Sequence, residues 1–200
     1  NVAGRQRSSR REEGRRSRLR QRLALAATPP LALVMGVALA ASSPTMAEGS
    51  ERLASQLGRA PAEAIAAEAA RLAERHPADY FPHLLAAQAF ERERPLRVDR
   101  MLPFTARAMY LRPAHPTAHH LAARALLAAG RREQARLEYR LSIGYGNHAA
   151  IAEVARRFET AEDLLAAVPA DVHAVGTLID RLLQAKRMEI AQSVAERFLE

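Results

Sequence analysis

PHLLAAQAF at positions 82–90 and PTAHHLAAR at positions 116–124 decide the fold, because the second stretch repeats the first at an offset of 34 residues. Each begins with proline, which suits the first turn of a helix, and each continues with closely spaced Ala and Leu. Self-similarity at a period of about 20–50 residues is typical of repeat architectures. We therefore expect an all-α chain of antiparallel helix pairs.

Helical spacing of Ala, Leu, Glu and Arg extends from Glu48 onward, and its breaks fall at Pro, Gly and Asn. Asp79 is expected to cap one helix, and Thr160 with Asp163 resembles a capping box for another. Pro103 implies that its helix either starts late or is kinked. No strand pattern is present. The expected helices lie at about 51–57, 61–75, 79–90, up to 111, 116–130, 133–143, 149–157, 161–167, 171–184 and 187–199.

The amino-acid composition limits how the hydrophobic core can be built and which catalytic or metal-binding side chains are available. The chain has 200 residues, of which 48% are hydrophobic and only 4% aromatic, with no Trp, so the core must be built from Ala and Leu. The absence of Cys excludes disulfides, thiolate metal sites and cysteine nucleophiles. The formal charge is +8, but residues 1–22 contain nine Arg and two Glu and supply nearly all of it. The rest of the chain is almost neutral.

The N-terminal region combines this basic run with an apolar stretch. Residues 1–22 have almost nothing to bury, so we expect a disordered Arg-rich segment. Residues 23–47 carry no charge, and 23–41 would span about 28 Å as a helix, enough to cross a bilayer. The positive-inside rule places the arginines in the cytoplasm. We expect a transmembrane helix and short linker at 23–47, followed by an extracytoplasmic repeat domain at 48–200.

Two other interpretations of this region remain open. The basic flank, apolar stretch and Ala38-Leu39-Ala40 also fit a cleaved signal peptide, and the stretch could instead be a buried or disordered Ala-rich segment. The arginines are explained by membrane orientation, so nucleic-acid binding is not needed to account for them. No aromatic residues that could stack on bases interleave with them. The chain begins with Asn1 and stops inside a helical pattern, so we expect it to be a piece of a longer polypeptide.

The repeat at 116–144 resembles the tetratricopeptide family. It has small residues at Ala123 and Ala135, a glycine between its helices at Gly130, and Tyr139 four residues after the second small position. The preceding copy is degenerate, because Met101 stands at the small position. Residues 171–199 form a third copy, with Ala191 at that position, whereas 148–169 is too short for a full repeat. The resemblance implies a right-handed superhelix whose concave face holds a peptide or protein segment.

Carried over to the matching positions, the resemblance predicts which side chains would meet that partner. The mixture does not indicate a charged clamp for one defined ligand, and an ordinary mixed surface is an equally open interpretation. The predicted partner-binding residues are His83, Phe90, Glu93, Thr117, His120, Arg124, His173, Asp180 and Gln184, together with the smaller or apolar Ala86, Leu127 and Gly176.

A second resemblance concerns the whole order of segments. The chain is similar to the C-terminal region of O-antigen ligase/polymerase-like membrane proteins of some Gram-negative bacteria, in which an Arg-rich loop leads into the last membrane helix and a tetratricopeptide-like domain follows. Such proteins carry their glycan-transfer chemistry upstream, so no catalytic residue is carried over. The stretches that carry the likeness are HPADY at 76–80, ARAMYLRP at 106–113, AARALL at 122–127, GRREQA at 130–135 and LEYRL at 137–141.

The sequence offers little chemistry of its own. His115, His119 and His120, with His148, are the best metal candidates, but no acidic residue lies near them and we expect no metal and no cofactor. Ser142 has no nucleophile-elbow context. The charges around Glu133, Arg136, Glu138 and Arg140 indicate a solvated helix face. The expected function is protein–protein interaction by a membrane-tethered domain in the bacterial periplasm, with a soluble periplasmic adaptor as the alternative.

Overall fold

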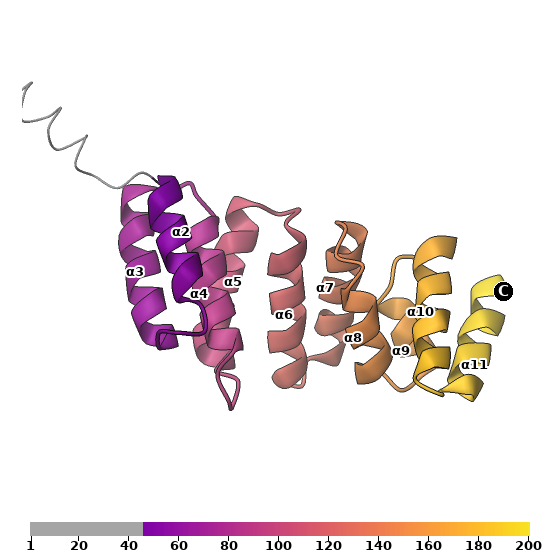
Figure 1. The fold of residues 1–200 in the computed structure, drawn as a ribbon. Coiled ribbons are helices and arrows are strands. Elements are labelled where there is room, and N and C mark those ends of the chain that lie inside the picture. Colours follow the sequence, from indigo (N-terminus) through magenta and orange to yellow (C-terminus); the bar gives the residue numbers. More distant parts are fainter. Residues whose placement is uncertain (1–45) are drawn as a thin grey trace, which may run out of the picture. The chain divides into compact units, whose positions relative to one another are not determined.

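The computed structural model describes residues 46–200, which form one compact unit. This unit is entirely helical, so the all-α expectation is confirmed for the part of the chain that is described. Figure 1 shows the helices following one another in a row. They are α2 (Met46–Gln56), α3 (Ala62–Arg75), α4 (Phe81–Glu91), α5 (Val98–Leu111), α6 (Pro116–Ala128), α7 (Arg132–Gly144), α8 (Ala150–Arg157), α9 (Ala161–Ala166), α10 (Val172–Gln184) and α11 (Met188–Leu199).

The helices form five consecutive pairs. Within this arrangement α2 contacts α4, α4 contacts α6, and α8 contacts α10, whereas α7 contacts α9 and α9 contacts α11. We call α2, α4, α6, α8 and α10 the first-helix layer, and the other five helices the second-helix layer. The fourth pair, α8 and α9, is the shortest, with eight and six residues. The segment that the sequence marked as too short for a full repeat therefore forms two short helices, of which α8 contacts α7 and α10 and α9 contacts α7 and α11.

Local signals account for most helix ends. Pro116 opens α6, and Gly130, with φ of 76°, follows its C-terminus in a conformation that glycine adopts without strain. The Thr160 side chain accepts a hydrogen bond from the Asp163 N–H, which confirms the expected cap of α9. Asp79 was expected to cap α4, but the N-cap residue is Tyr80 and no side chain caps this helix; Asp79, one residue earlier, accepts from the Phe81 N–H at 2.8 Å instead.

The start of helix α5 rules out one of the two alternatives that Pro103 implied, a late start or a kink. It begins at Val98 and runs through Pro103, so it does not start late. Proline removes an N–H donor that would otherwise bond to the carbonyl four residues earlier. Pro103 is exposed, so the carbonyl left without that partner can be satisfied by water.

The core consists of two clusters that meet at α6. Ala118, Leu121 and Ala125 of α6 belong to the cluster formed with α2 to α5, whereas Ala123 of the same helix belongs to the cluster formed with α7 to α11. Alanines with no exposed surface at these crossings allow close approach of the helix axes. The few aromatics fill the remaining space, as in the edge-to-face pair of Tyr139 and Phe158, whose ring centroids lie 6.0 Å apart.

Two of the sequence expectations concern residues outside the described part. The Arg-rich segment at 1–22 and the apolar stretch at 23–41 both lie there. Between residues 46 and 200, no helix combines the length and the hydrophobicity that crossing a bilayer requires. The compact unit begins at Met46, slightly before the expected start of the repeat domain at 48.

One residue in the described chain pays a conformational penalty that can be removed. Lys186 has φ of 59° and follows the C-terminus of α10, where α6 has Gly130. A residue with a side chain in this left-handed conformation costs about 1 kcal/mol more than glycine. We expect Lys186→Gly to raise the free energy of unfolding by about 0.5–1 kcal/mol, measured by urea denaturation of residues 46–200. Ala185→Gly, at a residue with φ of −82°, is the matched control and should give no gain.

Candidate functional site

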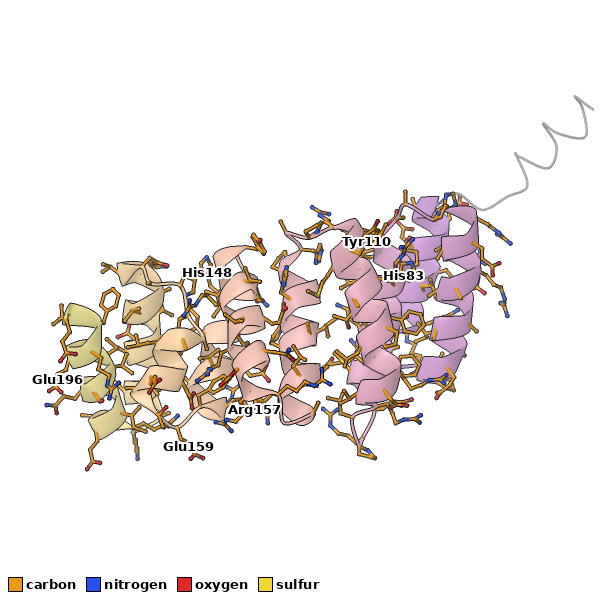
Figure 2. All side chains as sticks on the ribbon, turned by 180° about the vertical axis from the view of Figure 1, so that it is seen from behind. His83, Tyr110, His148, Arg157, Glu159 and Glu196 are labelled. Carbon is orange, nitrogen blue, oxygen red and sulfur yellow. The ribbon has the colours of Figure 1, made fainter. Side chains whose placement is uncertain are left out.

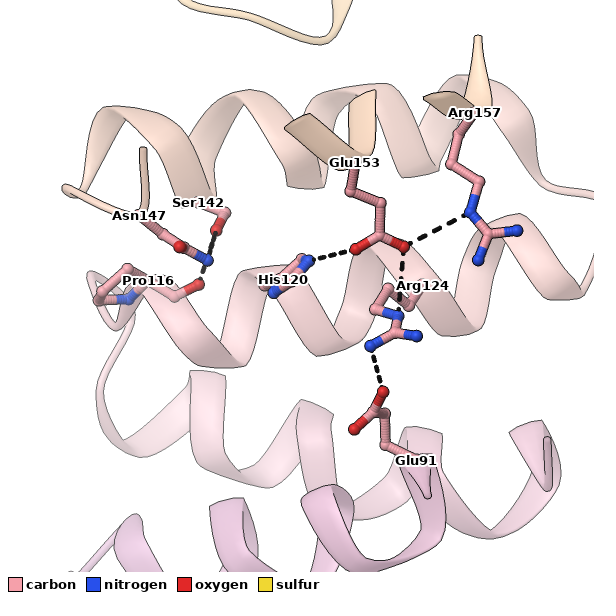
Figure 3. A network of polar contacts seen from close by, with 8 residues as sticks. All are labelled: Glu91, Pro116, His120, Arg124, Ser142, Asn147, Glu153 and Arg157. Atoms are coloured by element: carbon pink, nitrogen blue, oxygen red, sulfur yellow. Dashed lines mark hydrogen bonds and ion pairs between the residues drawn. The ribbon is translucent and has the colours of Figure 1, made fainter. Parts of the chain in front are cut away.

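Five polar side chains from three first-layer helices form one network (Figure 3). Glu91 extends from α4, His120 and Arg124 from α6, and Glu153 and Arg157 from α8. The Arg124 guanidinium donates to Glu91 and also reaches Glu153, with Nε 3.3 Å from Oε1. His120 Nε2 lies 2.8 Å from Glu153 Oε2, and Arg157 Nε lies 3.5 Å from Oε1. Glu153 is therefore the centre on which three donors converge.

The environment of Glu153 favours its ionised form. Its side chain is only 12% exposed, and this burial by itself would raise the pKa of the carboxyl. The hydrogen bond from His120 and the positive charges of Arg124 and Arg157 outweigh burial and lower the pKa of Glu153 to about 2. The network therefore ties α6 and α8 together through a carboxylate that remains charged at any ordinary pH.

A pocket of about 290 Å³ lies beside the network. Arg94 and Leu96, from the segment between α4 and α5, line it together with Leu127, Tyr139 and the charged residues Arg124, Glu153 and Arg157. Arg94 donates to the backbone carbonyls of Glu91 and Glu93, so its charge is not neutralised by a carboxylate. Three guanidinium groups against one carboxylate make the lining cationic, which favours a small anionic group.

Tyr139 forms part of the pocket wall and has an unusual hydroxyl. Its side chain is fully buried, and its hydroxyl oxygen makes no hydrogen bond of ordinary geometry. Burial, followed by the nearby Glu153 carboxylate, raises the pKa of Tyr139, so the hydroxyl stays protonated and can donate. The acceptor beside this hydroxyl is the Glu153 carboxylate, which contributes to the raised pKa both by its charge and as a hydrogen-bond acceptor.

Of the predicted partner-binding residues, the structure brings His120 and Arg124 together on Glu153. Thr117, one turn earlier on α6, is half-buried and takes no part in the network. Thr117, His120 and Arg124 all lie on α6, a helix of the first-helix layer. Whether they meet a partner stays a prediction.

The predicted partner-binding residues of α4 and of the loop after it are buried or half-buried. Phe90 is fully buried and stacks on Phe104 with ring centroids 5.9 Å apart, so it belongs to the core and not to an exposed face. His83 is half-buried, and burial and then Arg107 lower its pKa. Glu93 is also half-buried and lies in the segment after α4.

The predicted residues of α10 are exposed and form a separate group. His173, Asp180 and Gln184 all lie on the solvent side of this helix. The His173 ring contacts His148 edge-to-face, with centroids 5.9 Å apart. Figure 2 shows His148 at the upper edge of the row of helices and Arg157 at its lower edge, so the His148–His173 contact and the Glu153 network lie near opposite ends of α8.

The histidines that served as weak metal candidates have separate partners. His119 is 5% exposed, and its ring nitrogens bond to Glu138 at 2.6 Å and to the Pro113 carbonyl. Burial opposes protonation of His119, but these two acceptors raise its pKa. His120 bonds to Glu153 instead. Residues 46–200 contain no group of three or more side chains suited to holding a metal ion.

The charges on α7 correct one sequence expectation. Arg136 and Glu138 were expected on a solvated face, but their side chains are only 21% and 20% exposed. Arg136 pairs with Asp163 of α9, and Glu138 pairs with His119 of α6. Both pairs join α7 to a neighbouring helix, which single-helix periodicity cannot reveal.

Sequence reasoning missed Glu91, Glu153 and Arg157. A usable signal was present, because Glu91 and Arg124 are 33 residues apart, and so are His120 and Glu153. This spacing is close to the 34-residue repeat offset, which places equivalent positions on neighbouring first-layer helices. Searching for opposite charges at that spacing would have identified the network.

The one serine singled out in the sequence is occupied by structural hydrogen bonds. Ser142 donates to the Pro116 carbonyl and accepts from Asn147, so its hydroxyl has a structural role. Within residues 46–200, the described polar contacts assemble no nucleophile with a base and an oxyanion donor. The cationic lining of the pocket favours a small anionic group.

The pKa of Glu153 yields a pH test. Because this pKa lies near 2 rather than 4.5, the ionised network stabilises the fold above about pH 4.5 and loses that contribution as the pH falls toward 2. We expect Glu153→Gln to lower the free energy of unfolding by about 2–3 kcal/mol at neutral pH, because its loss leaves Arg124 and His120 without this acceptor. The difference from the unmodified protein should shrink below pH 4 in urea titrations.

Glu159→Gln is the matched control, since Glu159 is exposed and directly follows Phe158 after α8. Its effect should stay within about 0.5 kcal/mol at every pH. A Glu153→Gln penalty that is independent of pH would show that the carboxylate charge is not what stabilises the network.

No known family model matches this chain, and no curated protein matches it significantly.

Proposed function

We propose that residues 46–200 are a tetratricopeptide-like superhelical domain that binds a protein or peptide segment on its first-helix side. The observation that carries this proposal is the row of five first-layer helices, with a cationic pocket lined by α6, α8, Tyr139 of α7 and the segment between α4 and α5. Such a row offers an extended surface to which each pair contributes side chains. The buried small residues Ala135 and Ala191 support the repeat assignment.

The partner surface extends on both sides of the Glu153 network. The pocket would receive an acidic side chain, and the exposed His173, Asp180 and Gln184 of α10 would contact the continuing segment. Phe90 is excluded from this surface by its burial. The half-buried His83 and Glu93 would lie at its other end.

The cellular role follows from the order of segments in the sequence. We propose that the Arg-rich run and the apolar stretch at 23–41 tether this domain outside the cytoplasm, as part of an O-antigen ligase/polymerase-like protein that assembles cell-surface glycans. The domain would position a partner protein, and the glycan chemistry would lie in other parts of such a protein. The support is the resemblance of segment order, with basic tail, apolar span and repeats in succession.

Partner binding can be tested by site-specific photocrosslinking in the native host. We expect a photoreactive amino acid at Asp180, on the first-helix side, to capture a discrete partner protein. The same amino acid at Leu137, which is 56% exposed on the second-helix layer, is the matched control and should capture little. Equal capture from both positions would contradict binding on the first-helix side.

Localisation needs a separate measurement. With an antibody to residues 48–200, we expect a band that resists alkaline extraction of host membranes and migrates well above 22.0 kDa. A soluble band smaller than 22.0 kDa would show that the apolar stretch is a cleaved signal, and the soluble periplasmic adaptor would then replace the tethered domain.

A further inference from the structure

One buried histidine connects three neighbouring segments of the chain. His119 of α6 is 5% exposed, and its Nδ1 lies 2.6 Å from Oε2 of Glu138 on α7. Its Nε2 bonds to the carbonyl of Pro113, in the turn between α5 and α6. A single imidazole ring therefore holds the α5–α6 turn on one side and α7 on the other.

Both partners of this ring are hydrogen-bond acceptors. A backbone carbonyl has no proton to donate, and an ionised carboxylate has none either, so each contact needs an N–H from the ring. A neutral imidazole carries one N–H, whereas an imidazolium carries two. The two contacts exist together only when the His119–Glu138 pair holds one proton more than a neutral imidazole and a carboxylate. An imidazole is more basic than a carboxylate, which places this proton on His119.

The surroundings of His119 permit this charge. Burial opposes protonation, but the Glu138 carboxylate and the Pro113 carbonyl outweigh it and raise the pKa of His119 above its ordinary value of 6.5. The Glu138 side chain is 20% exposed, so the carboxylate keeps some access to water.

The other titratable groups near His119 do not compete for the proton. Burial, followed by the charge of Arg112, lowers the pKa of His115, so the ring of His115 is neutral near pH 7 and does not repel an imidazolium. On the α7 side, the Tyr145 ring lies 5.3 Å from the His119 ring, centroid to centroid. On the α4 side, the Tyr80 ring contacts His115.

The repeat shows that this position does not require a polar side chain. At the offset of 34 residues, His119 corresponds to Leu85 of α4, which is 2% exposed. His119 is the fourth residue of α6, and the fourth residue of the equally long α10 is Val175, also 2% exposed. Apolar side chains often stabilise a core at least as well as a buried ion pair does. The histidine therefore gives this position a property that Leu85 and Val175 lack, which is dependence on a proton.

The contact also crosses the boundary between the two core clusters. Ala108 of α5 belongs to one cluster, and Tyr139 of α7 belongs to the other. We propose that His119 is a proton-dependent link between the two halves of the unit, which holds the α5–α6 turn to α7 while its ring is charged. When the proton is lost to solvent, the ring keeps one N–H. The carboxylate is the stronger acceptor, so the Pro113 carbonyl is the contact that opens.

Hydrogen exchange of the full 200-residue chain, followed by NMR, measures this opening. The link is complete below pH 6.5, the ordinary pKa of histidine, and is lost as the pH rises through the raised pKa of His119. The N–H groups of Arg112 and His115 bond to the carbonyls of Ala108 and Arg112 and report on the turn. Across that rise, we expect their protection factors, corrected for the intrinsic exchange rate, to fall about five- to tenfold.

Glu138→Gln separates the proton from the contact. A glutamine amide can donate to Nδ1 of a neutral imidazole, whose N–H then donates to the Pro113 carbonyl, so both contacts survive without the extra proton. We expect this variant to keep its protection factors as the pH rises. Glu133→Gln, at an exposed residue of the same helix, is the matched control and should lose protection as the unmodified chain does.

The ring itself can be observed by labelling the histidines with ¹⁵N in the full chain. The titration midpoint of His119 should lie above 6.5 in the unmodified chain and below 6.5 in Glu138→Gln, where burial acts without the carboxylate. A midpoint below 6.5 in the unmodified chain would overturn the proposal, because the ring would then be neutral while both contacts are made. Equal loss of protection in the unmodified chain and in Glu138→Gln would overturn it too, since titration of His119 would not control the turn.

Discussion

A helix pair built from alanine and leucine cannot bury both of its apolar sides, and this constraint governs the whole unit. Each pair covers one side of its neighbour, so the structure grows by stacking. Leu53 of α2 is completely buried only because α3 and α4 lie against α2. The low aromatic content has the same consequence, since alanines at the helix crossings allow the close approach that replaces bulky side chains.

The polar network follows from the same constraint. Helix α8 has only eight residues, so it offers less apolar surface to α6 than a full first-layer helix would. Glu153 compensates, because it hydrogen-bonds to His120 of α6 and forms ion pairs with Arg124 of α6 and Arg157 of its own helix. The space left beside the short helix is the cationic pocket. The site most suited to binding therefore lies where the repeat is shortened.

Much of this architecture could be predicted from the sequence, because prolines, glycines and capping residues act locally. Pro116 and Gln184 mark an observed helix start and an observed helix end, as expected. Helix α2 starts at Met46, earlier than the expected 51, and so includes Gly49. The reason for this glycine is tertiary: a Cβ at Gly49 would lie 2.9 Å from a methyl group of Leu72 on α3. The site was harder to predict, because Arg136 and Glu138 find their partners on other helices.

The sharing of α6 between two core clusters has a dynamic consequence. A unit that folds by nearest-neighbour contacts opens in cooperative segments, and segments usually follow the boundaries of clusters. Here the boundary runs through a single helix, with Leu121 facing one cluster and Ala123 the other. Either half can therefore open while α6 remains held by the half that stays closed. The amide hydrogens of α6 would then exchange only when both halves open together, which makes this helix the slowest-exchanging element of the unit.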